Sequence, residues 1–242
     1  MPRERSSTRR VSPRPDVSPE ELSIVWLSLK VAGIATLASA IPAIGVAWLL
    51  ARGRFWGRTA LNVLVHLPLV VPPVVTGYFL LRLFGRRGPI GAWLEESLGL
   101  QFSFRWTGAA LAAAVMAFPL LVRAIRLGVE SVDRPVEDAA ATLGASPLWT
   151  FLTITLPLAL PGVFAGLIIG FAKALGEFGA TITFVSNIPG ETQTLALAIF
   201  TQLERPGGDA AAIRLIWLSV GISVVALIAS ELLSRSVRRI QS

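Results

Sequence analysis

The sequence contains no cysteine, a single histidine and two methionines among its 242 residues. Without cysteine, the chain has no disulfide bond, zinc-thiolate site or thiol nucleophile. The scarcity of histidine and methionine argues against a relay for soft metal ions. His66 stands in an apolar stretch with no second imidazole or neighbouring carboxylate, so we interpret it as a packing residue rather than a metal ligand.

Lysine is almost as scarce, because all but two of the 22 basic residues are arginine. Neither Lys30 nor Lys173 follows a glycine, so the chain has no phosphate-binding loop of the G-x-x-x-x-G-K-[ST] type. Ser-His-Asp and Glu-x-x-His patterns are missing as well. The sequence therefore predicts a protein that is not an enzyme, needs no cofactor and does not itself bind ATP through such a loop.

Charge is sparse and apolar residues are abundant. Charged residues make up 15% of the chain and hydrophobic residues 53%, with a mean hydropathy of +0.66, whereas a soluble domain carries about 25% charged residues. Several apolar stretches approach the ~20 residues that a helix needs to cross a bilayer. The chain is therefore expected to be an all-α integral membrane protein.

The net charge of +7 comes from arginines that cluster at the ends of the apolar stretches. In a soluble protein such a surplus would suggest a nucleic-acid partner. Arginines at the ends of spans instead anchor loops to anionic lipid and set the orientation in the membrane. We therefore expect membrane lipid, and no nucleic acid, to be the partner of these charges.

Hydropathy predicts about five transmembrane helices within one permease domain, residues 22–235, flanked by a disordered tail at 1–21 and a basic tail at 236–242. Shorter helices are expected near Ile90–Leu98 and Thr194–Leu203. The five predicted spans are Ile24–Leu50, Leu61–Phe84, Thr107–Ile125, Leu156–Leu175 and Ile213–Leu233.

Prolines and glycines distinguish two of these spans. Pro68, Pro72 and Pro73 must break or kink the second span, which frees backbone carbonyls at membrane depth. Such a break either faces a translocation path or serves packing alone. The GxxxGxxxG spacing of Gly162, Gly166 and Gly170 favours close helix packing in the fourth span, with a subunit interface as one location.

Five spans place the two termini on opposite sides of the membrane. The arginine-rich loop 52–58, the segment 123–157 and the arginine-rich C-terminus then fall on one face, which the positive-inside rule assigns to the cytoplasm. We expect the N-terminus to lie outside the cytoplasm, although the five arginines of the N-terminal tail go against the positive-inside rule.

Lys173 and Glu177 form an i,i+4 pair at the outer end of the fourth span, where charge is costly. They are either a structural ion pair or part of a gate in the outer vestibule. The following residues offer backbone freedom and hydroxyl groups suited to transient contact with an oxyanion. With Pro72 and Pro73, the candidate pathway residues are Lys173, Glu177, Phe178, Gly179, Thr181 and Thr183.

The polar segment 134–157 interrupts the apolar stretches. Pro135 can open a short helix that Gly144 ends, and Ser146-Pro147 can cap and start a second one. Pro157 and Pro161 would then mark the turn into the fourth span. The segment is either a compact projecting element or an ordinary amphipathic loop.

These residues resemble the EAA loop of importer-type ABC transporter permeases. The pattern E-A-A, three residues, G, nine residues, I-x-L-P is matched by Asp138-Ala139-Ala140, Gly144 and Ile154-Thr155-Leu156-Pro157, with aspartate in place of glutamate. The resemblance implies a coupling loop that docks on a separate ATPase. Its candidate residues are Glu137, Asp138, Ala139, Ala140, Gly144, Ile154, Leu156 and Pro157.

More narrowly, the chain is similar to bacterial molybdate permeases through HLPLVVPPVVTGY (66–78), VMAFPLLVRAIRLGVESVD (115–133) and LGEFGATITFVSNIPGETQT (175–194). The resemblance implies a MetI-like ABC importer permease fold and a homodimer in the bacterial inner membrane. It also implies two copies of an ATPase subunit and an extracytoplasmic molybdate-binding protein as partners.

Two alternatives stay open at this point. The same machine could carry tungstate, sulfate or another tetrahedral oxyanion, because sulfate permeases share the GEFGA part of the last block. An ion-coupled secondary transporter is the rival from another class, but the spans show neither acidic relays nor inverted repeats.

Overall fold

The structure, a computed structural model, describes the backbone of residues 18–241 and the side chains of residues 18–226 and 228. Every regular element in that range is a helix. Four helices are long and apolar enough to cross a membrane, and a bent pair brings the number of candidate spans to five. The four are α1 (Pro19–Arg52), α5 (Trp106–Glu130), α8 (Leu156–Leu175) with the helical residues before it, and α11 (Asp209–Gln241). The predicted all-α membrane fold is confirmed.

The start of α1 is fixed by a capping box. The Ser18 hydroxyl accepts from the Glu21 N–H at 3.1 Å, and the Glu21 carboxylate accepts from the Ser18 N–H at 2.9 Å. The tail predicted for residues 1–21 is therefore too long, because residues 19–21 belong to the helix, and its first part, residues 1–17, lies outside the described range. Glu21 also pairs with Arg214 of α11 at 3.1 Å, which ties the two helices together.

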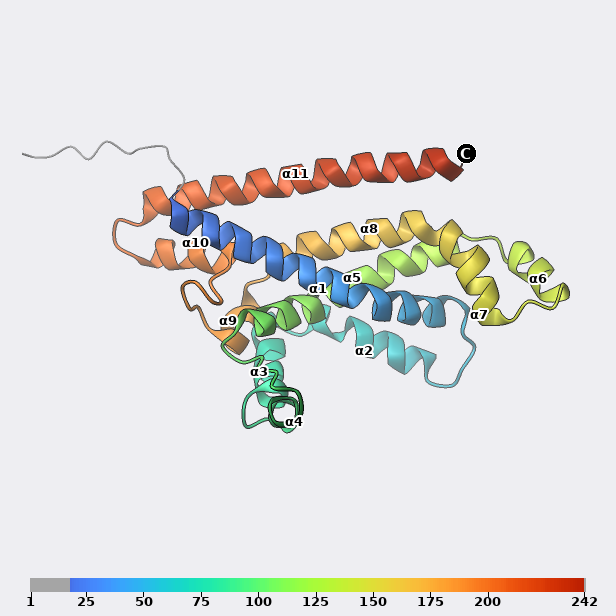
Figure 1. Ribbon diagram of the computed structural model, residues 1–242, viewed down its shortest axis with the longest axis horizontal. Coiled ribbons are helices and arrows are strands. Elements are labelled where there is room, and N and C mark those ends of the chain that lie inside the picture. The colour runs from blue at the N-terminus through green and yellow to red at the C-terminus, as the bar shows by residue number, and fades with distance from the viewer. Residues whose placement is uncertain (1–17, 242) are drawn as a thin grey trace, which may run out of the picture.

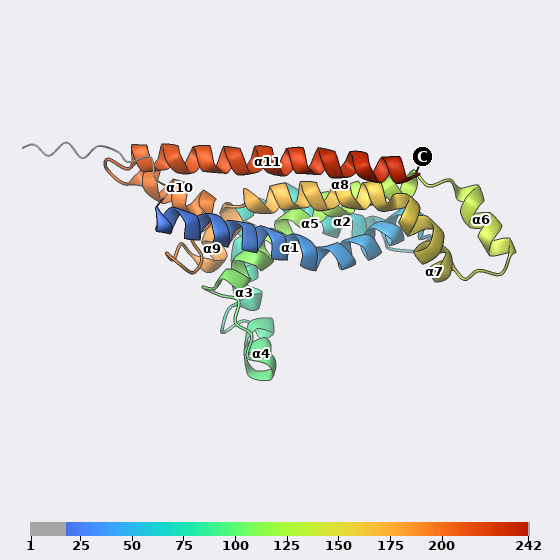
Figure 2. The same cartoon turned by 45° about the horizontal axis from the view of Figure 1, so that its top comes forward.

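The broken span consists of α2 (Arg58–Val70) and α3 (Pro73–Phe84), which meet at an angle of 113°. Pro72 and Pro73 lie at the bend, where proline prevents a continuous hydrogen-bond ladder. The predicted break is confirmed, and it is a sharp turn rather than a kink. Beyond it, α3 and the short α4 (Pro89–Leu98) project away from the long helices (Figure 2).

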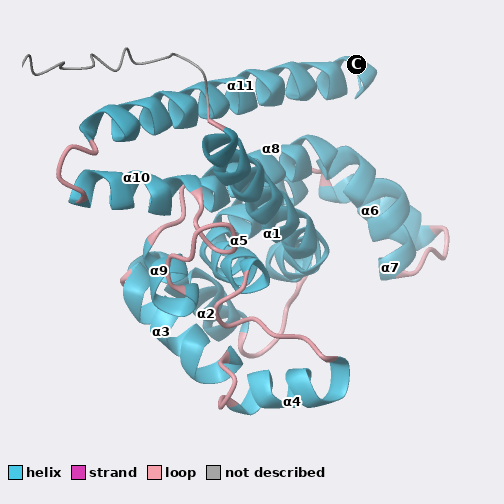
Figure 3. Cartoon of the chain, turned by 60° about the vertical axis from the view of Figure 1, so that its left-hand side comes forward, coloured by secondary structure: helices cyan, strands magenta, loops and turns pink. Residues whose placement is uncertain are grey.

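Helix α5 is the centre of the bundle. It lies against both α1 and α8, with α11 on one side of this group and α3 and α4 on the other (Figure 3). Its larger side chains Leu121, Val122 and Ile125 are fully buried, and most of its alanines are buried as well, namely Ala109, Ala110, Ala112, Ala113 and Ala117. The prediction of a buried third span is therefore correct.

The glycines of α8 provide the closest approach between helices. A Cβ built on Gly162 would lie 2.5 Å from the Cα of Gly128 in α5, and one on Gly166 would lie 2.9 Å from Ile125. Only glycine allows the backbones to come this close. The glycine face therefore packs inside this chain, which corrects the idea that it serves a subunit interface.

The polar segment forms α6 (Arg134–Thr142), α7 (Pro147–Thr150) and a π-helical turn, Phe151–Thr155, that runs directly into α8. Gly144 ends the first part with φ +87°, and the Ser146 hydroxyl caps α7 by accepting from the Trp149 N–H at 3.3 Å. Both predicted features are confirmed.

The predicted turn at Pro157 and Pro161 is wrong, because the helix is continuous from Pro147 to Leu175. Pro157 has no N–H to donate, and the wider π-helical turn adjusts the backbone just before it. There the Leu156 N–H donates to the Phe151 carbonyl, five residues back.

The ends of the bundle differ. The connection between α1 and α2, the α6–α7 projection and the C-terminal end of α11 lie at one end (Figure 1). The start of α1, the α3–α4 projection, α9 (Gly179–Val185) and α10 (Leu195–Glu204) lie at the other. This is the grouping that the sequence predicts, and α10 matches the short helix expected near Thr194–Leu203.

Candidate functional site

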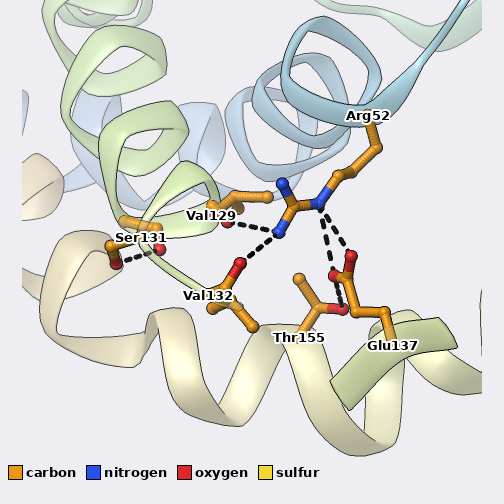
Figure 4. A network of polar contacts seen from close by, with 7 residues as sticks. Arg52, Val129, Ser131, Val132, Glu137 and Thr155 are labelled. Carbon is orange, nitrogen blue, oxygen red and sulfur yellow. Dashed lines mark hydrogen bonds and ion pairs between the residues drawn. The ribbon is translucent and has the colours of Figure 1, made fainter. Parts of the chain in front are cut away.

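At the end that carries α6 and α7, Arg52 is the centre of a polar network (Figure 4). Its Nη2 donates to the carbonyls of Val129 and Val132, at 2.9 and 2.8 Å, at and just beyond the end of α5. Its Nε lies 2.9 Å from Oε2 of Glu137 in α6. The Thr155 hydroxyl donates to the other carboxylate oxygen, Oε1, at 2.6 Å. One guanidinium therefore joins α1, α5 and α6, and the carboxylate extends the network to the π-helical turn.

The two neighbouring acids of the predicted coupling loop have different surroundings. Glu137 faces the bundle, and its side chain is 16% exposed. Asp138 is exposed, and no ion pair or hydrogen bond of its side chain is found within the described part of the chain. Asp138 is thus exposed at the surface, while Glu137 is held by this chain.

The projection presents an apolar surface beside Asp138. Leu143 is 89% exposed, and Leu148 and Trp149 are 60% and 62% exposed. Leu143 follows α6 directly, and Leu148 and Trp149 lie in α7, so these exposed apolar side chains gather on the α6–α7 projection. Of the predicted coupling residues, Ala139 and Gly144 are exposed here, and Ala140 is half-buried.

Ile154, Leu156 and Pro157 are not on the projection. They lie at its base, where the π-helical turn enters α8, and Ile154 and Leu156 are half-buried. The matched motif therefore combines an exposed part with a part that fixes how the projection joins the span.

At the opposite end, Lys173 and Glu177 form the predicted ion pair at 2.5 Å. The Glu177 side chain is 2% exposed, and its second oxygen accepts from the Ala180 N–H at 3.0 Å in the first turn of α9. The carboxylate thus caps α9 and joins it to the end of α8.

Helix α9 packs tightly against α3, just beyond the bend in the broken span. A Cβ on Gly77 would lie 2.5 Å from the Ala180 carbonyl, and one on Gly179 would lie 2.8 Å from Pro73. The structure therefore brings Pro72 and Pro73 together with the candidate pathway residues that follow Glu177, although they lie about a hundred positions apart in the sequence.

The backbone freedom expected for residues 177–183 is not found. Gly179–Val185 is a helix, Thr181 is 1% exposed, and the Thr183 hydroxyl donates to the Gly179 carbonyl at 2.9 Å. Phe178 packs against Phe200 of α10 with their ring centroids 5.0 Å apart. The Thr183 hydroxyl is thus bonded within its own helix.

Sequence reasoning missed the role of Arg52, which it interpreted only as a charge that sets orientation. Arg52 and Glu137 are 85 positions apart, so local spacing holds no sign of their contact. The pair of Glu21 and Arg214 was missed for the same reason, with 193 positions between its members. The one signal that the sequence offered for Arg52 was its place as a basic residue in the last turn of a span.

The fold and these two ends define a class of protein, a multi-pass helical membrane subunit with short helices projecting from one end. Residues 43–239 match the family described as binding-protein-dependent transport system inner membrane component. The chain belongs to this family. It is a multi-pass inner-membrane transport subunit rather than an enzyme, and the ABC importer context implies ATPase and binding-protein partners.

Curated relatives cover nearly the whole chain. The molybdenum transport system permease protein ModB of Haemophilus influenzae is 53% identical over 90% of this chain and 96% of its own length. The protein of the same name from Escherichia coli K12 is 54% identical, with shares of 89% and 94%. The sulfate transport system permease protein CysT of E. coli K12 is 34% identical, with shares of 93% and 78%.

Solved structures share the fold. The inward-facing MetNI methionine ABC transporter matches with a TM-score of 0.67 at 14% identity, covering 89% of this chain and 95% of the matched chain. A bacterial ABC transporter involved in alginate import matches with a TM-score of 0.69 at 17% identity, covering 93% and 81%. The predicted MetI-like permease fold is thereby confirmed.

Proposed function

We propose that this chain is the membrane-spanning permease of an ATP-driven molybdate importer. The observation that carries the proposal is the identity of more than half with two molybdenum transport permeases over almost the whole of each chain. Identity to the sulfate permease is 34%, which makes a sulfate importer the second candidate. Tungstate has the same charge and tetrahedral shape as molybdate, so it is the expected second substrate.

The importer would contain two copies of this chain around one path, two copies of an ATPase subunit and an extracytoplasmic molybdate-binding protein. The end with α6 and α7 would face the cytoplasm and the N-terminus would lie outside, because the arginine-rich loop and the basic end of α11 accompany α6 and α7. Residues 22–235 would act as one permease domain.

The segment 134–157 would dock on the ATPase through the exposed surface around Asp138, Leu143 and Trp149. Closure of the ATPase dimer would then push the two projections together and switch access to the path. No covalent step takes place in this chain, so coupling would be mechanical, through α6 and through α7, which is continuous with α8.

The path would be gated where α3 meets α9. Pro72 and Pro73 set the bend, Lys173 and Glu177 hold the end of α8, and α9 carries Gly179 and Thr183 into the contact. Small displacements of α8 would reach α9 through Glu177, which contacts both helices. Of the remaining candidate residues, Phe178 packs against Phe200 of α10 and Thr181 is buried.

The decisive experiment is uptake of labelled molybdate by vesicles that contain the permease, its ATPase and the loaded binding protein. Uptake should require ATP and binding protein and should be suppressed by excess tungstate, while an equal excess of sulfate should leave most of it. Suppression by sulfate as strong as by tungstate would favour the second candidate. Absence of molybdate uptake by these vesicles would contradict the proposal.

A further inference from the structure

Helix α6 has few attachments to the rest of the molecule. None of its side chains is fully buried, so apolar packing does not fix its position. The polar contacts of its side chains with other described elements all pass through Glu137, which contacts Arg52 and Thr155. Figure 4 shows the carboxylate between these two residues.

Arg52 is suited to hold such a helix. Its planar guanidinium donates to the Val129 and Val132 carbonyls and to the carboxylate at the same time, which the single ammonium of lysine cannot reproduce in the same geometry. The Arg52 and Glu137 side chains are only 15% and 16% exposed, so water competes weakly for the contact. The Val129 carbonyl belongs to the last turn of α5, the central helix of the bundle, and the Val132 carbonyl lies two residues beyond its end.

We propose that Arg52 and Glu137 are positioning residues for energy coupling, a brace that makes α6 move as one body with the ends of α1 and α5. The inference rests on the proposed function, in which α6 belongs to the segment that an ATPase moves. With the brace intact, a push on α6 displaces the spans. Without it, α6 moves independently of the spans, and ATP hydrolysis drives transport less efficiently.

The test compares Glu137→Gln and Arg52→Lys in vesicles holding the full importer. Both variants should insert and bind the ATPase, while the molybdate transported per ATP hydrolysed falls about tenfold, the scale of one lost charge-assisted hydrogen bond. Thr155→Val should act in the same direction, and Thr155→Ser, which keeps the hydroxyl group, should restore the ratio. The matched control is Arg54→Ala, because Arg54 is exposed and two positions away.

A double-variant comparison separates a brace from two independent effects. If Arg52 and Glu137 act together, Glu137→Gln should change the ratio little in an Arg52→Lys background. Full additivity of the two effects would overturn the proposal. A normal ratio in both single variants, or loss of ATPase binding in either, would overturn it as well, the latter because the residues would then be docking residues.

A second measurement does not depend on the substrate. Amide hydrogen exchange in the detergent-solubilised permease should be about tenfold faster across 134–142 in Glu137→Gln than in the unaltered chain, and unchanged in α5. Unchanged exchange in α6 would overturn the brace. If the unaltered importer does not transport molybdate, the proposed substrate is wrong. The exchange experiment still tests whether Arg52 and Glu137 hold α6, because it does not involve the substrate.

Discussion

Glu177 is the residue whose surroundings most need a functional test. Its carboxylate is 2% exposed, pairs with Lys173 and accepts from the Ala180 N–H, so it contacts both α8 and α9. A buried pair can be purely structural, and replacing both partners by apolar residues is then often tolerated. If Glu177 is instead a gate residue, it cannot be replaced by an apolar residue, because its contact with α9 takes part in opening and closing the path.

We expect Glu177→Ala to reduce molybdate uptake about tenfold or more while the inserted amount of protein changes little, because both the ion pair with Lys173 and the hydrogen bond from the Ala180 N–H are lost. The double variant Lys173→Met, Glu177→Met removes the unpaired charge and serves as the control. It should insert normally and remain defective in uptake. Recovery of uptake in the double variant would assign Glu177 to a structural pair.

At the scale of elements, the left-handed residue between α6 and α7 controls the shape of the projection. Gly144 has φ +87°, and proline, whose φ is fixed near −65°, cannot adopt it. We expect Gly144→Pro to give a folded, inserted protein that fails to bind its ATPase or to stimulate hydrolysis, measured by co-purification and phosphate release.

The control for this substitution is Gly190→Pro. Gly190 has φ +77° and open space around it, as Gly144 does, but it lies in the loop between α9 and α10 at the other end. Gly190→Pro should leave ATPase binding intact. Normal coupling in Gly144→Pro would contradict the docking role of the projection.

The contact between α5 and α8 is the second element-scale prediction. Gly162→Ala places a Cβ 2.5 Å from a backbone atom of Gly128, so the helices must separate. We expect a loss of about 1–3 kcal/mol in stability, typical of overpacking, seen as a lower unfolding temperature in detergent. Gly45→Ala in α1 meets no atom within 4 Å, and it should be neutral or stabilising because alanine favours the helix. Equal effects of the two variants would contradict the packing argument.

At the scale of the whole molecule, the testable property is orientation. The chain has no cysteine, so single cysteines can report on each end without background. Leu98 in α4 is 60% exposed, and Arg54 is exposed in the loop after α1. A membrane-impermeant maleimide should label Leu98→Cys in intact spheroplasts and Arg54→Cys only after permeabilisation. The reverse pattern would invert the proposed orientation.

The elements were largely predictable from sequence. The lengths of apolar stretches located the spans, the prolines at 72 and 73 located the break, and Gly144 and Ser146 located the end of α6 and the start of α7. These signals are local, because they act through backbone geometry or through the cost of charge in lipid. Where a local signal was interpreted too strongly, as at Pro157, a π-helical turn kept the helix continuous.

The sequence by itself determined the membrane class, the spans, the break at Pro72 and Pro73, the helix boundaries at Gly144 and Ser146, and the motif that indicates an importer. Only the tertiary structure decided which surfaces meet. It turned the glycine face of α8 toward α5, brought α9 onto α3, and placed Arg52 against Glu137 while leaving Asp138 exposed. The physical reason is that hydropathy and turn preferences are properties of neighbours along the chain, whereas these contacts join residues far apart and depend on how the helices pack.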